Sequence, residues 1–69
     1  MIVEGKLALA ARHVAKGRQI VAQQRALVAK KRAAGQDTTL AEGVLVQFEN
    51  SLAVFEADLL AIKKEESSK

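Results

Sequence analysis

The sequence predicts an all-α fold: an antiparallel two-helix hairpin, similar to a coiled coil, that pairs with a second copy to form a four-helix bundle. First, apolar residues between positions 45 and 62 recur at alternating steps of three and four, which lines one helix face for a partner helix. Second, the chain has no proline, which favours long uninterrupted helices. Third, 69 residues without cysteine form a small domain whose modest core has no disulfide to stabilise it as a monomer.

The first predicted helix covers residues 2–34. Its apolar stripe runs through Val14, Val21 and Val28, but Gly17 and Gln24 occupy two positions where the period calls for a large apolar residue. Because glycine inside a helix costs about 1 kcal/mol relative to alanine, we expect a facing Leu or Phe side chain to enter the space at Gly17. Gln24 is either a buried polar group that fixes the register or a stripe residue near the solvent edge.

The predicted turn covers residues 35–38. Gly35 suits the left-handed conformation that ends many helices, and the basic residues at 30–32 complement the negative end of the helix dipole. Any of residues 37–39 (Asp, Thr, Thr) can cap the next helix. A connection this short makes the second helix run antiparallel beside the first.

The second predicted helix covers residues 39–64 and is followed by a frayed tail at 65–69, so that residues 1–69 form a single helical-hairpin domain. We expect the apolar stripes of the two helices to pack together as a seam. The residues assigned to this seam are Val14, Val21, Val28, Leu45, Phe48, Leu52, Phe55 and Leu59.

Charge is distributed unevenly between the two predicted helices. The first is strongly basic, whereas acids dominate the segment from 42 to 58. This pattern fits either a nucleic-acid-binding surface on the first helix or neutralisation of one helix by the other. In an antiparallel hairpin, charges that repeat every seven residues meet as three ion pairs, which are Arg18 with Glu56, Arg25 with Glu49 and Arg32 with Glu42.

The opposite edge of the seam is partly apolar. A single pair of helices cannot cover the apolar surface that this edge adds to the seam, and a homodimer is the simplest closed arrangement that covers it. We expect Ile20 and Leu27 to help make the dimer contact. The residues on this edge are His13, Ile20 and Leu27 of the first helix and Val44, Ser51 and Asp58 of the second.

The sequence offers little for catalysis. It has no glycine-rich phosphate loop, no Glu-x-x-His pair and no Cys or His cluster, and Glu42, Glu49 and Glu56 lie about two turns apart along one stripe instead of converging. We therefore expect a non-enzymatic protein without cofactor or metal. No apolar run reaches the roughly 20 residues of a membrane span, so we expect a cytoplasmic protein without a membrane partner.

His13 begins a short motif. Residues 13–17 read His-Val-Ala-Lys-Gly and resemble the His-x-x-Lys-Gly core of histidine phosphotransfer domains. The resemblance implies that His13 accepts a phosphoryl group, that Lys16 neighbours the phosphate and that Gly17 leaves room for a receiver domain. The alternative is structural, with His13 at the bundle edge paired with Asp58.

From about residue 13 to residue 59, the chain is also similar to a group of small bacterial helical-hairpin proteins of unknown function, common in alphaproteobacteria. This resemblance implies the hairpin and no activity. The shared features are His13, Gly17, Gln24, the turn residues Gly35, Asp37 and Thr38, Ala41, and the spacing of Leu45, Phe48 and Leu52.

Three hypotheses for function follow. In the first, the protein is a homodimeric helical hairpin that acts as an interaction or regulatory module and binds a protein partner. In the second, the dimer binds RNA through its basic first helix, with Arg12 and Lys16 among the phosphate contacts, because the predicted architecture is similar to that of the small plasmid regulator Rop. The third is phosphotransfer through His13.

Overall fold

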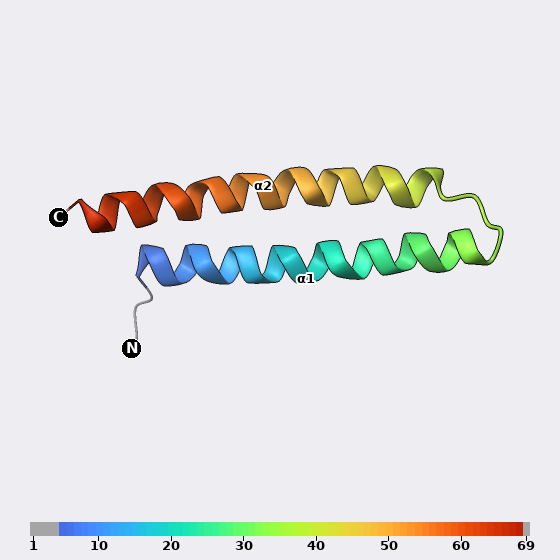
Figure 1. Ribbon diagram of the computed structural model, residues 1–69, viewed down its shortest axis with the longest axis horizontal. Helices are drawn as coiled ribbons and strands as arrows, with labels where there is room; N and C mark the ends of the chain where they lie inside the picture. The colour runs from blue at the N-terminus through green and yellow to red at the C-terminus, as the bar shows by residue number, and fades with distance from the viewer. Residues whose placement is uncertain (1–4, 69) are drawn as a thin grey trace.

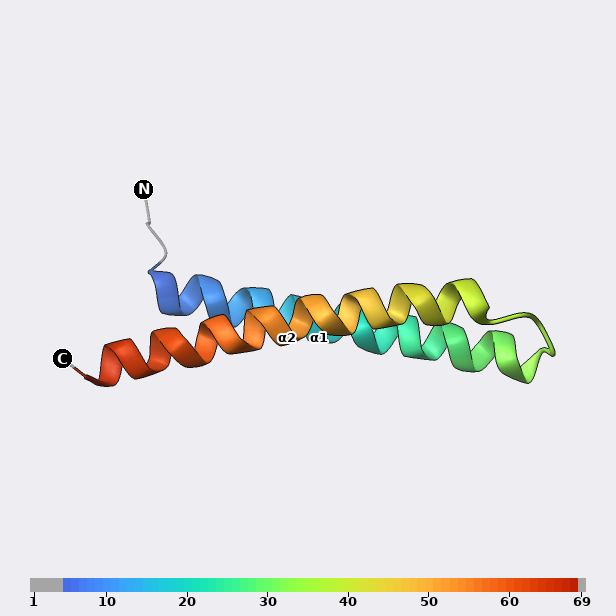
Figure 2. The ribbon, with the colours of Figure 1, turned by 90° about the horizontal axis from the view of Figure 1, so that it is seen from above.

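The structure, a computed structural model, describes residues 5–68, which form two α-helices and the turn between them. α1 covers Lys6–Ala33 and α2 covers Thr39–Ser67. The helices run antiparallel and side by side, with the turn at one end of an elongated molecule (Figure 1) that measures 54 × 26 × 14 Å. Seen from above, they cross at a shallow angle (Figure 2). The all-helical hairpin predicted from the sequence is confirmed.

α1 begins later than the sequence predicts. Gly5 has an extended backbone (φ −71°, ψ 163°) and precedes the first helical residue, Lys6, without a side-chain cap. Residues 2–4, where the predicted helix starts, lie outside the described residues. From Lys6 onwards, residues of high helix propensity, mostly Ala, Leu, Lys, Arg and Gln, continue the helix for 28 residues.

α1 ends at Ala33, and Gly35 closes it. Gly35 has φ +72°, a left-handed conformation that glycine adopts without the steric cost of a Cβ. The Gly35 amide donates a hydrogen bond to the Arg32 carbonyl (3.0 Å), and the Gln36 amide donates one to the Lys31 carbonyl (2.9 Å). These two bonds make a Schellman motif, which satisfies carbonyl groups that the helix leaves unpaired at its end.

Asp37 holds the turn that leads into α2. Its Oδ1 accepts hydrogen bonds from the Thr39 backbone N–H (2.9 Å) and the Thr39 hydroxyl (2.7 Å), which is an Asx turn. Both bonds lower the pKa of Asp37 below its ordinary value because they favour the charged carboxylate, and the bond from the backbone N–H has the larger effect. Thr38 occupies the capping position itself but forms no side-chain cap.

α2 continues to Ser67, three residues beyond its predicted end. Glu65, in this last part, forms an ion pair with Lys6 at the start of α1, with 3.6 Å between Nζ and Oε1. The hydroxyls of Ser67 and Ser68 donate hydrogen bonds to the Lys64 carbonyl (3.2 and 2.8 Å). The predicted frayed tail is therefore helical through Ser67, because these contacts hold the helix end and satisfy one of its carbonyls. Residue 69 lies outside the described residues.

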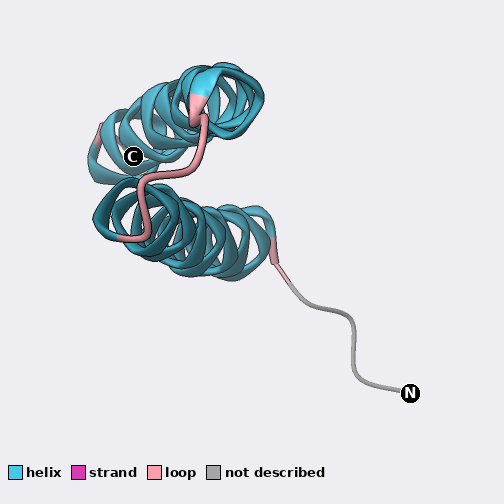
Figure 3. Ribbon diagram, turned by 90° about the vertical axis from the view of Figure 1, so that its right-hand side faces the viewer, coloured by secondary structure: helices cyan, strands magenta, loops and turns pink. Residues whose placement is uncertain are grey.

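The core between the helices is thin. Within the described chain, the buried side chains are all small, namely Ala10, Val14, Val21, Val28 and Ala41. The large side chains of the predicted seam face them from α2 but are only half-buried, and these are Leu45, Phe48, Leu52, Phe55 and Leu59. Ile62, further along α2, is half-buried as well. These side chains stay half-buried because each described helix has only the other one beside it, as the view from the turn end shows (Figure 3).

The two unusual seam positions both make contacts across the hairpin. A Cβ on Gly17 would lie 3.1 Å from Cδ1 of Leu52 and 3.7 Å from Cδ2 of Phe55, so these side chains fill the space that the glycine leaves. Gln24 donates a hydrogen bond from Nε2 to the backbone carbonyl of Ala41 at 2.9 Å. This bond agrees with the register-fixing alternative for Gln24.

Candidate functional site

One edge of the seam, which we call the charged flank, is closed by ion pairs. Side-chain distances of 3.1 Å and 2.9 Å join the first two pairs, and all the side chains involved are substantially exposed. Each exposed pair contributes only about 0.2–1 kcal/mol, so the main effect of the three is to fix the register. The pairs are Arg18 with Glu56, Arg25 with Glu49 and Arg32 with Glu42, the same three pairings that the sequence predicts.

The opposite edge, which we call the open flank, has no such ladder of three pairs within residues 5–68. The seven-residue spacing places on it His13, Ile20 and Leu27 of α1 and Val44, Ser51 and Asp58 of α2. Ile20 and Val44 are half-buried, and Leu27 is 41% exposed. Leu40, four residues before Val44 and so on the same side of α2, is 83% exposed. The turn half of the open flank is therefore an apolar strip that the hairpin leaves uncovered.

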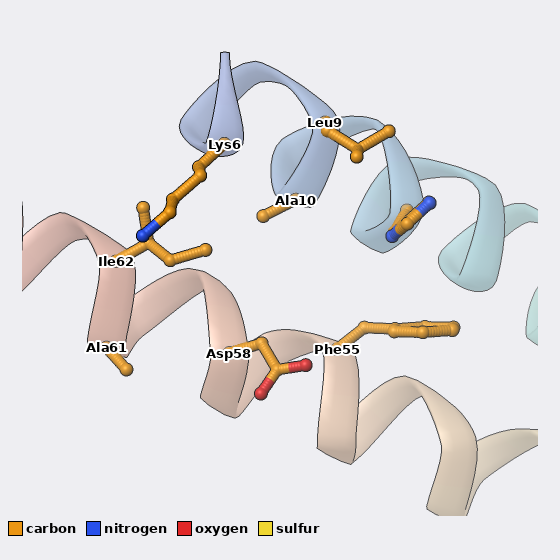
Figure 4. A pocket seen from close by; sticks show the side chains of 8 residues that line it. Lys6, Leu9, Ala10, Phe55, Asp58, Ala61 and Ile62 are labelled. Atoms are coloured by element: carbon orange, nitrogen blue, oxygen red, sulfur yellow. The ribbon is translucent and has the colours of Figure 1, made fainter. Parts of the chain in front are cut away.

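A groove of about 300 Å³ opens on the open flank at the end away from the turn (Figure 4). Ile62 projects from α2 toward α1, and the side chain of Lys6 reaches down toward it from α1. The walls of the groove are mainly apolar, with Lys6 and Asp58 as charged groups. The full lining is Lys6, Leu9, Ala10 and His13 from α1 and Phe55, Asp58, Ala61 and Ile62 from α2.

His13 packs against an aromatic ring. The centroids of the His13 and Phe55 rings are 5.4 Å apart, and the ring planes are tilted by 40°. Although His13 and Asp58 both line the groove, no hydrogen bond or ion pair joins them among the described residues, so the predicted His13–Asp58 pairing is wrong. The imidazole is placed by its ring contact instead.

The surroundings of His13 give little support to the phosphotransfer hypothesis. Gly17, which the resemblance to phosphotransfer domains assigns to the contact with a receiver domain, is half-buried and faces Leu52 and Phe55 inside the hairpin. Lys16 is exposed beside it. Phosphotransfer through His13 stays a prediction from sequence resemblance alone.

The basic residues of α1 do not gather into one unpaired row. Arg18, Arg25 and Arg32 are each bound to a glutamate of α2, which neutralises much of the charge that suggests a nucleic-acid surface. Arg12 and Lys16 are exposed, and their predicted contact with phosphates stays a prediction. The sequence alternative in which one helix neutralises the other therefore has the greater structural support.

Sequence reasoning missed two features of this surface. The Lys6–Glu65 pair could have been found, because Lys6 lies seven residues before His13 and Glu65 lies seven residues after Asp58, which continues the same edge. The groove has a weaker signal in Ala10 and Ala61, whose small side chains stand where the seam and its edge carry larger ones elsewhere. Small side chains at one level leave space between two helices.

No three His, Cys, Asp or Glu side chains within residues 5–68 lie close enough together to hold a metal ion. In the same part of the chain, neither helix is long and apolar enough to cross a membrane.

Comparison with protein-family models, curated proteins and solved structures finds no match for this chain.

Proposed function

We propose that this protein is a non-enzymatic interaction module that works as a homodimer, with two hairpins packed through their open flanks into a four-helix bundle. The observation that carries this proposal is the incomplete burial of every large side chain in the seam. In a bundle of four helices these side chains face a common interior. The protein partner that such a module regulates or recruits would then bind its outer faces.

Energetics favour closure of the open flank. Full burial of a Leu, Ile or Phe side chain stabilises a fold by about 1.5–3 kcal/mol, and the single hairpin forgoes part of this at each of its large seam residues. A chain of this size has little else to offset the conformational entropy lost on folding. A second hairpin would complete the burial of Phe55 and Ile20 and would cover Leu27 and Val44.

Of the two edges, the open flank is the one suited to this contact. On the charged flank, a partner would have to remove water from three ion pairs, and the desolvation of charges is costly. The open flank offers Ile20, Leu27 and Val44 instead. A two-fold axis through this face lets the same patch serve both copies, as in most homodimers.

The proposal is tested by one leucine on each side of the hairpin. Leu27 lies on the open flank and is 41% exposed, whereas Leu60 is 56% exposed and borders the charged flank beside Arg18 and Glu56. We expect Leu27→Glu to shift the solution mass, measured by light scattering, from dimer to monomer, and we expect Leu60→Glu to leave the dimer intact. Equal effects of the two changes, or no effect of Leu27→Glu, would contradict the proposal.

A further inference from the structure

We infer that the two hairpins of the dimer pack with their turns at the same end, so that α1 of each copy lies against α2 of the other. This inference rests on the homodimer proposed above and specifies how the second copy sits on the open flank. Two arrangements are compatible with a two-fold axis between the open flanks. An axis along the helices puts the turns together and α1 against α2, whereas an axis across the helices puts the turns at opposite ends and α1 against α1.

The open flank, together with the residues beside it on each helix, forms one face of the hairpin, which we call the open face. On this face, the basic residues belong to α1 and the acidic residues belong to α2. Leu9 and His13 line the groove, and residues at seven-residue steps from Leu9 follow it along the same face of α1. α1 therefore contributes only basic or neutral side chains to this face, whereas α2 contributes the acids. The basic set is Lys6, His13, Lys16 and Lys30, and the acidic set is Asp58 and Glu65.

Packing of α1 against α1 would bring the two basic rows together, and packing of α2 against α2 would do the same for the acids. Like charges brought face to face across an interface weaken it. With the turns at the same end, Lys6, His13 and Lys16 instead face the end of α2 of the other copy that carries the two acids. Of these charges, Lys16, Lys30 and Asp58 form no ion pair within residues 5–68, so they are available to a second copy.

The level of Asp58 supports the same arrangement. Asp58 and His13 both line the groove, and each lies seven residues inside the Lys6–Glu65 pair, which puts them at about one level of the hairpin. With the turns together, Asp58 of the partner subunit would lie at the level of His13, and Lys16 is only three residues, about 4.5 Å of helix rise, further along. A lysine side chain spans that distance, so each copy can offer Lys16 to the carboxylate of the other.

The positions of the apolar residues favour the same arrangement. Leu27, Leu40 and Val44 all lie in the turn half of the open face, whereas Asp58 lies in the other half. With the turns together, Leu27, Leu40 and Val44 of one copy lie at the level of the same residues of the other. With the turns apart, Leu40 and Val44 of the other copy would cover Asp58 without offering its carboxylate a partner, and burial of an unpaired charge is costly.

A single spin label at the turn distinguishes the two arrangements. The native chain has no cysteine, so Gln36→Cys gives one attachment site on the exposed turn. We expect the distance between the two labels of a dimer, measured by pulsed electron paramagnetic resonance, to be comparable with the 26 Å width of the hairpin. A distance approaching its 54 Å length would overturn the inference.

A second label and the solution mass distinguish a wrong arrangement of the two hairpins from the absence of a homodimer. Asn50→Cys places the label near the middle of α2, where both arrangements give distances within the width of the bundle, so its signal verifies that labelled chains still pair. A dimer mass with a long Gln36→Cys distance would overturn the arrangement and leave the homodimer standing. A monomer mass with no distance from either label would overturn the homodimer itself and the arrangement with it.

Discussion

Gly17 faces Leu52 and Phe55 across the seam, so its replacement tests how closely the two helices pack. We expect Gly17→Leu to lower the free energy of unfolding and the melting temperature. Overpacking of a seam costs about 1–3 kcal/mol, while the removal of glycine from a helix returns about 1 kcal/mol. Even a Cβ at this position would lie 3.1 Å from Leu52, so we expect the packing cost to dominate.

The matched control for Gly17 is Gly43, which is also inside a helix but has nothing within 4 Å of an added Cβ. Gly43→Ala should therefore stabilise the protein by about 0.5–1 kcal/mol through helix propensity alone. Thermal denaturation at one fixed chain concentration measures both changes. An unchanged melting temperature for Gly17→Leu would show that residue 17 faces solvent.

Single residues differ in how far the sequence determines their surroundings. Gly17 and Gln24 could be assigned to the seam because the helical period leaves each only one face to occupy. The partner of His13 could not be assigned in this way, since the period brings both Phe55 and Asp58 within its reach, and packing decides between them. An imidazole beside an aromatic ring gains a contact between the two rings, whereas a pair with an exposed carboxylate gains little.

At the level of the helices, we expect the three ion pairs of the charged flank to act mainly on register. Arg25→Glu should destabilise the hairpin by up to about 1 kcal/mol, because it loses one exposed pair and sets a like charge against Glu49. Adding Glu49→Arg should recover much of this loss by restoring an opposite-charge pair. A double-mutant cycle measured by urea denaturation gives the coupling energy, and a coupling energy of zero would contradict the pairing.

The pairing of the helices follows from the sequence more directly than their ends do. A turn of a few residues at Gly35 and a seven-residue repeat of opposite charges leave few registers open. The three ion pairs can therefore be predicted from the residue spacing alone. Helix ends depend on contacts between distant parts of the chain. α2 reaches Ser67 while Glu65 contacts Lys6, and only the seven-residue spacing along the open flank, not the local composition after Lys64, indicates that contact.

For the whole molecule, Phe48 tests whether the seam is the core of the folded protein. Phe48→Asp would place a charge without a partner among the apolar seam side chains, and we expect it to abolish both helicity and dimerisation. Val46→Asp, on a side chain that is 53% exposed, is the control and should leave both intact. Circular dichroism and light scattering measure the two properties, and a helical, dimeric Phe48→Asp variant would refute the assignment of Phe48 to the core.

The candidate site could be predicted in part at this scale. Residues of the open flank, including Ile20, Leu27 and Val44, follow from the heptad positions beside the seam. Its groove does not, because a cavity depends on the volumes of all the side chains around it, and the effect of two small residues such as Ala10 and Ala61 emerges only when both helices are in place.

The measurement that tests the central claim most directly is the solution mass by light scattering across a dilution series, with helicity recorded on the same samples. If the open flank is covered by a second copy, the mass should fall from dimer to monomer on dilution, and helicity should fall with it because folding and association are coupled. A chain that stays helical as a monomer at every dilution would contradict this account and would leave the open flank as the binding site for a different partner.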